Sequence, residues 1–285
     1  MLPCHVVEII TPKKYVLNGL WFGPKKPKRV IIWVHGLSGS VFSNRRYLAK
    51  ILDNKTAVLT FNNRGHDIVS GTRRANGTFG PFGGEAHEIF TDCVDDIEGA
   101  VRFARRSRVK RMYVGGSSTG SQKTVYWASR TKYLRNVRGF ILAVPLSDHA
   151  STVYLRGRAK LKRAVEVART LVRKGKPREL LPSKLWHQPF DAQRFVSLYS
   201  GKGSEEIFTY WDPKQNPRAL RLIRAPALVL LAGKDEYSDR PAKSIAAWFE
   251  KHLRKCKVVI IPRATHSFRG AEKRVAREIR RFIAG

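Results

Sequence analysis

The sequence predicts an α/β fold in which helices flank a mostly parallel central sheet, with a mainly helical insertion in the second half of the chain. Short apolar runs alternate with helical patterns along most of the 285 residues, which is typical of parallel sheets covered by helices. Within each run the apolar residues are consecutive, as in strands buried on both faces. From about residue 149 to 222 the alternation stops, and we find no clear buried strand there.

The expected strands begin with a hairpin. Two extended stretches, residues 6–10 and 15–22, are separated by the turn-like sequence TPKK. Six shorter runs follow, each bounded by Gly, Pro or polar residues: 30–34, 57–61, 112–114, 140–144, 227–231 and 258–261. Their aliphatic composition is that of strands in the interior of a sheet.

Helical patterns fill most of the intervals between these runs, at about 41–53, 86–106, 119–131, 241–254 and 270–283. In the last of them Val275, Ile279, Phe282 and Ile283 recur at helical spacing among Lys and Arg. This spacing predicts an amphipathic helix whose apolar side covers the sheet.

The interruption divides the chain into a core, residues 1–148 and 223–285, and a cap insertion, residues 149–222. An insertion between two parallel strands is expected over the C-terminal edge of the sheet, where open α/β folds bind ligands. Its aromatic side chains could line an acyl or aromatic pocket or form the cap's own core and its packing onto the sheet. Both interpretations stay open for Trp186, Phe190, Phe195, Tyr199, Phe208, Tyr210 and Trp211.

The chain is strongly basic, with 55 Lys and Arg against 22 Asp and Glu and a formal net charge of +33. Residues 101–178 alone hold 21 basic and two acidic side chains. Such a block is compatible with binding to nucleic-acid phosphates. A solvated cationic surface is the favoured explanation, because no RNP signature, zinc finger or basic zipper is present. Nucleic-acid binding is therefore an alternative that the charge leaves open but does not favour.

Other classes are disfavoured by what the sequence lacks. No apolar run reaches the roughly 18 residues that a membrane-spanning helix needs, and the N-terminal sequence MLPCHVVEIITPKK does not resemble a secretory signal. Cys4, Cys93 and Cys256 are too few and too widely spaced for a disulfide framework or a metal site. We expect a cytoplasmic protein, whose oligomeric state cannot be inferred from the sequence.

The strongest local motif is GSSTG, residues 116–120, which fits the pattern G-x-S-x-G. It follows an expected strand and precedes an expected helix, the context in which this pattern forms a nucleophile elbow. An ordinary Gly/Ser turn can match five residues, but its position favours the elbow. The glycines set the register, so the candidate nucleophile is Ser118 and not Ser117.

A serine nucleophile needs a base and an acid that orients the base, and at such an elbow they follow in the order Ser, acid, His. Asp235 and His266 each lie just after an expected strand, so both should reach the same sheet edge as the serine. Glu236 and Asp239 in the same loop, and Asp148 after an earlier strand, are alternative acids. Asp235 is favoured because it is the first carboxylate past its strand.

The tetrahedral intermediate of such a reaction needs two hydrogen-bond donors for its oxyanion. We assign one to the backbone N–H of Thr119, directly after the nucleophile. The other is the N–H of Leu37, in the loop after an early strand. His35 in the same loop is expected to brace the loop.

Five segments together resemble the α/β-hydrolase superfamily over essentially the whole chain: HGLSG at 35–39, FNNRGHD at 61–67, GGSSTGS at 115–121, LAGKDE at 231–236 and ATHSF at 264–268. STGSQ after the elbow and FGGEAHEIFTDCVDDIEGAVRF before it are similar to a branch that includes fungal siderophore esterases. FNNRGHD is also similar to feruloyl esterases and monoacylglycerol lipases. Those relatives usually have His before the nucleophile, where this chain has Ser117.

The resemblance implies a serine hydrolase that cleaves carboxylic esters through a Ser118–His266–Asp235 triad and an acyl-enzyme, with no metal or other cofactor. The expected partner is a small-molecule ester, with anionic and aromatic esters both open. A serine peptidase or thioesterase would use the same triad, and a polyanion-binding protein on a hydrolase scaffold is an alternative of a different class.

Overall fold

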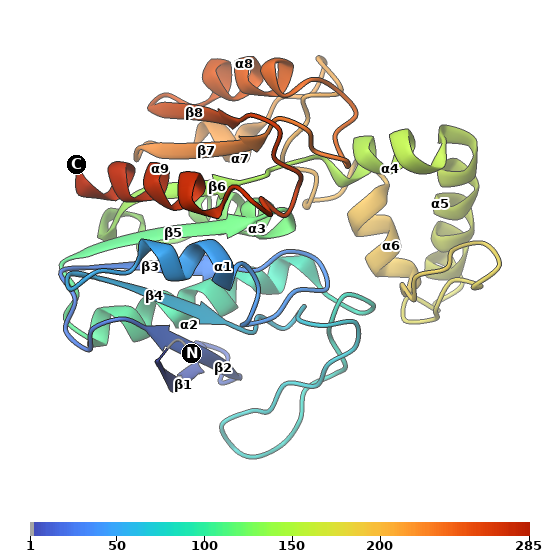
Figure 1. Cartoon of the computed structure of the whole chain (residues 1–285). Helices are drawn as coiled ribbons and strands as arrows, with labels where there is room; N and C mark the ends of the chain where they lie inside the picture. Colours follow the sequence, from blue (N-terminus) through green and yellow to red (C-terminus); the bar gives the residue numbers. More distant parts are fainter. Residues whose placement is uncertain (1–2) are drawn as a thin grey trace.

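The computed structural model describes residues 3–285 (Figure 1). Met1 and Leu2, which begin both the predicted core and the segment tested for a signal sequence, lie outside the described residues. One sheet holds eight strands in the order β1-β2-β4-β3-β5-β6-β7-β8. The strands are β1 (Cys4–Ile10), β2 (Val16–Phe22), β3 (Arg29–Val34), β4 (Thr56–Phe61), β5 (Arg111–Ser117), β6 (Val137–Ala143), β7 (Ala227–Ala232) and β8 (Cys256–Ile261).

The sheet is mostly parallel, as predicted. β1 pairs with β2 in the predicted hairpin, and β2 pairs antiparallel with β4. All further pairs, from β4–β3 to β7–β8, are parallel. The carboxyl ends of β3, β5, β7 and β8 therefore meet at one edge, where the loops with the candidate site residues begin.

Helices cover both faces of this sheet or project beyond its edge (Figure 1). They are α1 (Arg45–Leu48), α2 (Cys93–Arg106), α3 (Thr119–Ala128), α4 (Asp148–Arg156), α5 (Arg158–Arg173), α6 (Ala192–Tyr199), α7 (Arg218–Arg221), α8 (Ala242–His252) and α9 (Glu272–Ala284), with short 3₁₀ turns at η1 (Ala49–Ile51), η2 (Phe90–Asp92) and η3 (Leu134–Asn136). Within residues 3–285, no helix is long and apolar enough to span a bilayer.

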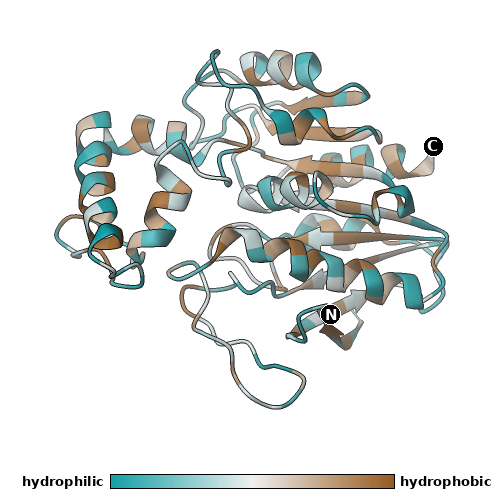
Figure 2. Cartoon of the chain, turned by 180° about the vertical axis from the view of Figure 1, so that it is seen from behind, coloured by the Kyte–Doolittle hydropathy of each residue, from teal (hydrophilic) through white to brown (hydrophobic). Residues whose placement is uncertain are grey.

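Two hydrophobic clusters form the core, one on each face of the sheet. Alternate side chains of β3 divide between them: Ile32 belongs to the cluster with residues of α2, α3 and α8, whereas Ile31 belongs to the cluster with residues of α1 and α9. The predicted amphipathic helix is α9, which buries Val275, Ile279 and Ile283. Figure 2 shows apolar residues concentrated along the strands between helices of mixed polarity.

Two predicted helices are shorter than expected. In place of a helix over 41–53, only α1 and η1 form, because Asn44 takes a left-handed conformation with φ of 62° and starts the helix late. In place of a helix from residue 86, α2 begins at Cys93. The N–H groups of Glu85 and Ala86 donate to the carbonyls of Asp67 and Ile68, which holds this segment against another loop.

The helices α4, α5 and α6 project from one side of the sheet (Figure 1). A third hydrophobic cluster joins residues between Leu161 and Tyr199 and includes Trp186, Phe190 and Phe195. Phe208 and Tyr210 belong instead to the main core, and Trp211 packs against it. The predicted cap limits, 149 and 222, stay a prediction.

Buried charges connect this projecting unit to the sheet. Arg194 on α6 is fully buried, and its guanidinium lies 2.9 Å from Glu88 Oε2 and against the Glu205 carboxylate. The other Glu88 oxygen lies 2.5 Å from the ammonium of Lys123 on α3. Each buried charge lies against an opposite charge. Their attraction offsets the free-energy cost of removing these ions from water.

Candidate active site

The turn between β5 and α3 holds Ser118 in a strained backbone conformation. Its φ is 56° and its ψ is −126°, a backbone conformation that residues with a Cβ rarely adopt. The turn is also crowded, because a Cβ on Gly116 would lie 2.3 Å from the Gly120 carbonyl oxygen. The Ser118 N–H donates to the Ala143 carbonyl at 2.9 Å. These contacts give the small residues of GSSTG a steric reason and leave the serine partly exposed.

The His266 ring is hydrogen-bonded to the Asp235 carboxylate. His266 Nδ1 lies 2.8 Å from Asp235 Oδ2 and 3.1 Å from Oδ1. The backbone N–H of His266 donates to the Glu236 carboxylate at 2.8 Å, which fixes the loop that carries the ring. The edge of the Tyr237 ring packs on the imidazole.

The alternative acids have other partners. Asp239 Oδ2 lies 2.8 Å from Arg240 Nη2. Asp148 accepts a hydrogen bond from the Gln122 amide at 2.9 Å. Of the four carboxylates considered, Asp235 is the one whose oxygens reach the His266 ring.

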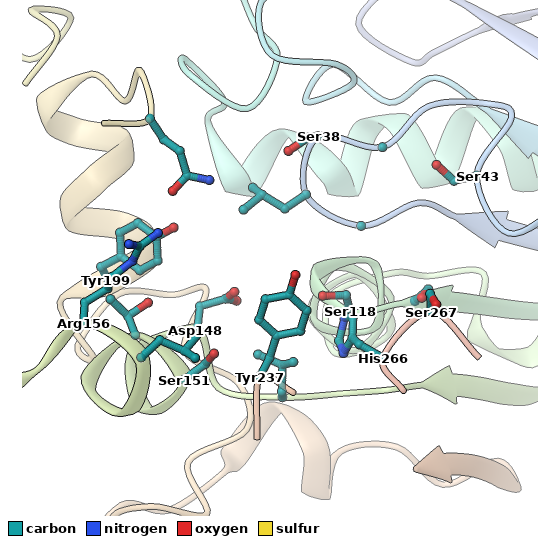
Figure 3. A pocket seen from close by; sticks show the side chains of 18 of the residues that line it. Ser38, Ser43, Ser118, Asp148, Ser151, Arg156, Tyr199, Tyr237, His266 and Ser267 are labelled. Carbon is teal, nitrogen blue, oxygen red and sulfur yellow. The ribbon is translucent and has the colours of Figure 1, made fainter. Parts of the chain in front are cut away.

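Ser118 and His266 line one cavity of about 510 Å³ (Figure 3). Within residues 3–285, no hydrogen bond joins Ser118 Oγ to the imidazole. Catalytic hydrogen bonds of this kind are often long in a free enzyme and shorten when substrate binds. The two side chains are therefore related by the cavity that both of them line.

Two backbone amides lie beside Ser118. The loop of Leu37 lies against the elbow, because a Cβ on Gly36 would be 3.1 Å from the Ser118 Cβ. Among the hydrogen bonds of residues 3–285, neither the Leu37 N–H nor the Thr119 N–H has an acceptor. Both amides are therefore open donors beside the serine, as an oxyanion site requires.

His35 fits the role of a loop brace. Its Nδ1 donates to the Gly36 carbonyl at 2.9 Å, and its Nε2 accepts from the Asn63 N–H at 3.3 Å. Burial, assisted by the nearby Lys123 charge, lowers the pKa of His35 to about 3. The ring is therefore neutral near pH 7, and both of its nitrogens have partners within the protein.

Glu85 is a residue at this site that sequence reasoning missed. Its carboxylate accepts a short hydrogen bond from the hydroxyl of Ser38, the residue after Leu37. Ser38 has φ of 52°, so the hydroxyl contact supports a strained turn in the loop that contains Leu37. Burial raises the pKa of Glu85. Its place within the FGGEAHE stretch was the one signal available.

The projecting helices supply the other side of the cavity. Figure 3 shows Asp148, Ser151, Arg156 and Tyr199 grouped away from the serine and histidine. Burial, followed by the Glu205 charge, raises the pKa of Asp148 to about 8. Within residues 3–285 we find no group of three His, Cys, Asp or Glu side chains that could hold a metal ion, and the cysteines are free thiols.

The sheet order, the flanking helices and the turn after β5 give the chain the α/β-hydrolase fold. The family described as "Protein of unknown function (DUF1749)" matches residues 30–283, so the chain belongs to that family. A search of curated proteins finds no match.

Solved structures with the same fold include several hydrolases. The siderophore hydrolase EstB from Aspergillus fumigatus is 16% identical with a TM-score of 0.72, covering 100% of this chain and 97% of EstB. Est1E from Butyrivibrio proteoclasticus, with ferulic acid bound, is 18% identical with a TM-score of 0.65 and covers 98% of each chain. The Pyrococcus furiosus esterase Pf2001 is 17% identical with a TM-score of 0.61, covering 99% of this chain and 91% of the esterase.

Proposed function

We propose that this protein is a serine hydrolase that cleaves carboxylic esters of small molecules. The observation that carries the proposal is the Asp235–His266 pair at 2.8 Å, on the same cavity as Ser118 in its elbow. A histidine held in this way can accept a proton at its other ring nitrogen, which is what a serine hydroxyl requires to become nucleophilic.

In the acylation step, Ser118 Oγ attacks the ester carbonyl carbon while His266 Nε2 takes the hydroxyl proton. The carbonyl π electrons move to the oxygen, and the Leu37 and Thr119 amides stabilise the resulting oxyanion. When the tetrahedral intermediate collapses, the bond to the alcohol oxygen breaks. That oxygen receives the proton from His266, and the acyl group stays on Ser118.

Deacylation repeats these steps with water. His266 removes a proton from water as the water oxygen attacks the acyl carbon. The proton then passes from His266 to Ser118 Oγ when the acid product leaves. Asp235 keeps the ring oriented and stabilises the imidazolium in both halves of the reaction.

Support for esters comes from the structural relatives, which include the esterase Pf2001 and a protein with bound ferulic acid. A peptidase or thioesterase would use the same groups, because leaving-group preference depends on cavity contacts and not on the triad. Parallel assays with matched ester, thioester and anilide substrates therefore belong in the first experiment.

The test is hydrolysis of 4-nitrophenyl esters together with labelling by a fluorophosphonate, mapped by peptide mass spectrometry. We expect the label on Ser118 and loss of turnover in Ser118→Ala. Ser129→Ala, at the far end of α3, is the matched control and should keep both. An active, unlabelled Ser118→Ala protein would rule the proposal out.

Polyanion binding remains a second candidate because of one surface. Six cations on α5 are exposed and, within residues 3–285, have no carboxylate within 4.0 Å: Arg158, Lys160, Lys162, Arg163, Arg169 and Arg173. Binding to duplex DNA that weakens log-linearly with salt would support this candidate. No binding at modest salt would discard it.

A further inference from the structure

A second cavity adjoins the candidate active site on the side away from the projecting helices. Its volume is about 520 Å³, and it shares Ser43, Asn44 and Ser267 with the first cavity. Figure 3 shows Ser43 and Ser267 on the opposite side of Ser118 from Arg156 and Tyr199. A substrate at the serine could therefore extend into either cavity.

Three arginines line the second cavity from two separate segments. Arg45 and Arg46 belong to α1, and Arg269 follows β8 three residues after His266. Within residues 3–285, none of the three has a carboxylate within 4.0 Å. The pKa of Glu272 is lowered by backbone hydrogen bonds and then by the charges of Arg46 and Lys50, so one carboxylate lies near the group. Three arginines against this one carboxylate leave an excess of positive charge, which attracts an anion.

Polar groups between the cavities add to this preference. Asn44 Oδ1 accepts a hydrogen bond from the Trp33 indole N–H at 3.0 Å, which orients the amide and leaves its NH₂ group as a donor. The Ser43 and Ser267 hydroxyls are further donors. Arginine forks with additional N–H and O–H donors form the donor set that binds carboxylate and phosphate oxygens.

The position of His266 indicates which part of an ester would enter the second cavity. The leaving alcohol oxygen must receive its proton from His266, so the alcohol portion departs next to that ring. Ser267 directly follows His266 and lines both cavities. His266 lines the first cavity only, so an alcohol portion that leaves past Ser267 extends toward the arginines, and the acyl portion then lies toward the projecting helices.

We propose that the second cavity is an anion subsite, in which Arg45, Arg46 and Arg269 bind a carboxylate or phosphate carried by the alcohol portion of the ester substrate. This inference rests on the proposed ester hydrolysis and names its substrate class. It also gives a local role to a small part of the +33 charge.

The test compares three acetate esters that differ in the group on the phenol: 4-acetoxybenzoate, 4-acetoxyphenyl phosphate and the neutral 4-acetoxybenzamide. Each is measured with the unchanged protein and with a variant carrying Arg45→Gln, Arg46→Gln and Arg269→Gln. The control variant carries Arg106→Gln, Arg108→Gln and Lys110→Gln, which removes the same charge before the amino end of β5, at the opposite edge of the sheet. Circular dichroism verifies that each variant is folded. Single substitutions separate the effects of the individual residues.

We expect the cavity variant to raise KM for one or both anionic esters by about tenfold, and to change the neutral ester and kcat less than twofold. The control should change all three esters less than twofold. Whichever anionic ester responds more identifies the carboxylate or the phosphate as the preferred group. Equal losses in both variants would indicate a long-range field, and equal effects on charged and neutral esters would also overturn the subsite.

A binding measurement separates this inference from the proposed function. Calorimetry with 4-acetoxybenzoate and 4-acetoxyphenyl phosphate uses the Ser118→Ala protein, so that binding is measured without hydrolysis of the ester. Binding that disappears with the three arginine substitutions supports the subsite even if no ester is hydrolysed. If esters are hydrolysed but neither anion binds, the subsite is wrong and the proposed function stands.

Discussion

His266 Nδ1 lies 2.8 Å from Asp235 Oδ2 although the two residues are 31 positions apart in the sequence. The loops after β7 and β8 bring them together, because these strands are parallel neighbours whose carboxyl ends lie at the same edge. Hydrogen bonding at Nδ1 places the ring proton there and leaves Nε2 as the basic nitrogen.

Replacing the acid should impair catalysis without unfolding the protein. In Asp235→Asn the amide can keep a contact with His266 but favours the wrong ring tautomer, so we expect kcat to fall by about 10³–10⁴-fold. Asp239→Asn, in the same loop but paired with Arg240, is the control and should change kcat less than threefold. A comparable fall in both variants would mean that the loop and not the Asp235 carboxylate is responsible.

The Ser38–Glu85 contact should matter for the oxyanion and not for substrate binding. We expect Ser38→Ala to lower kcat by about tenfold with KM nearly unchanged, because the loop that presents the Leu37 N–H loses its anchor. Glu85→Gln still offers an acceptor oxygen, so it should retain more activity than Glu85→Ala. Ser40→Ala, in the same loop without a Glu85 contact, is the control, and a loss confined to KM would contradict the prediction.

Asp148 should make stability depend on pH. Its pKa is raised to about 8 by burial and by Glu205 and Glu206, despite the Gln122 hydrogen bond and the nearby Arg194 charge. The folded protein therefore binds a proton that the unfolded chain has lost, so stability falls as pH rises from about 4 to 8.

The matching experiment is thermal unfolding of the unchanged protein and Asp148→Asn at pH 5, 7 and 9. Asn keeps the oxygen that accepts from Gln122 but cannot ionise. We expect the Tm of the variant, relative to that of the unchanged protein, to rise steadily with pH. Because Asp96 and Glu206 also have raised pKa values, the difference between the two proteins is the quantity to compare, and a constant difference would refute the prediction.

Removal of Arg194 should destabilise the fold strongly. Arg194→Ala would leave Glu205 and part of the Glu88 charge buried without their partner, which costs about 3–5 kcal/mol in comparable sites. Arg169→Ala, on the exposed side of α5, should change the free energy of unfolding by less than about 0.5 kcal/mol. Urea unfolding measures both, and similar midpoints for the two variants would show that the buried group is dispensable.

The sequence by itself determined the architecture and the local geometry. The six strands from β3 to β8 were identifiable as runs of consecutive apolar residues, which strands in a parallel sheet need, and β1 and β2 as extended stretches on either side of the turn-like TPKK. The elbow was identifiable because only small residues fit where a Cβ on Gly116 would meet Gly120. These are short-range steric and solvation requirements, and each is visible in a few neighbouring residues.

Only the tertiary structure decided which distant groups meet. Asp235, Glu236, Asp239 and Asp148 all satisfied the sequence requirement for an acid, and the path of two loops decided which one reaches His266. The backbone N–H groups of residues 85–86 donate to carbonyls of another loop, which delays the start of α2. In the same segment the Glu85 carboxylate accepts from the Ser38 hydroxyl. Such contacts join segments far apart in the chain, so no local pattern of residues specifies them.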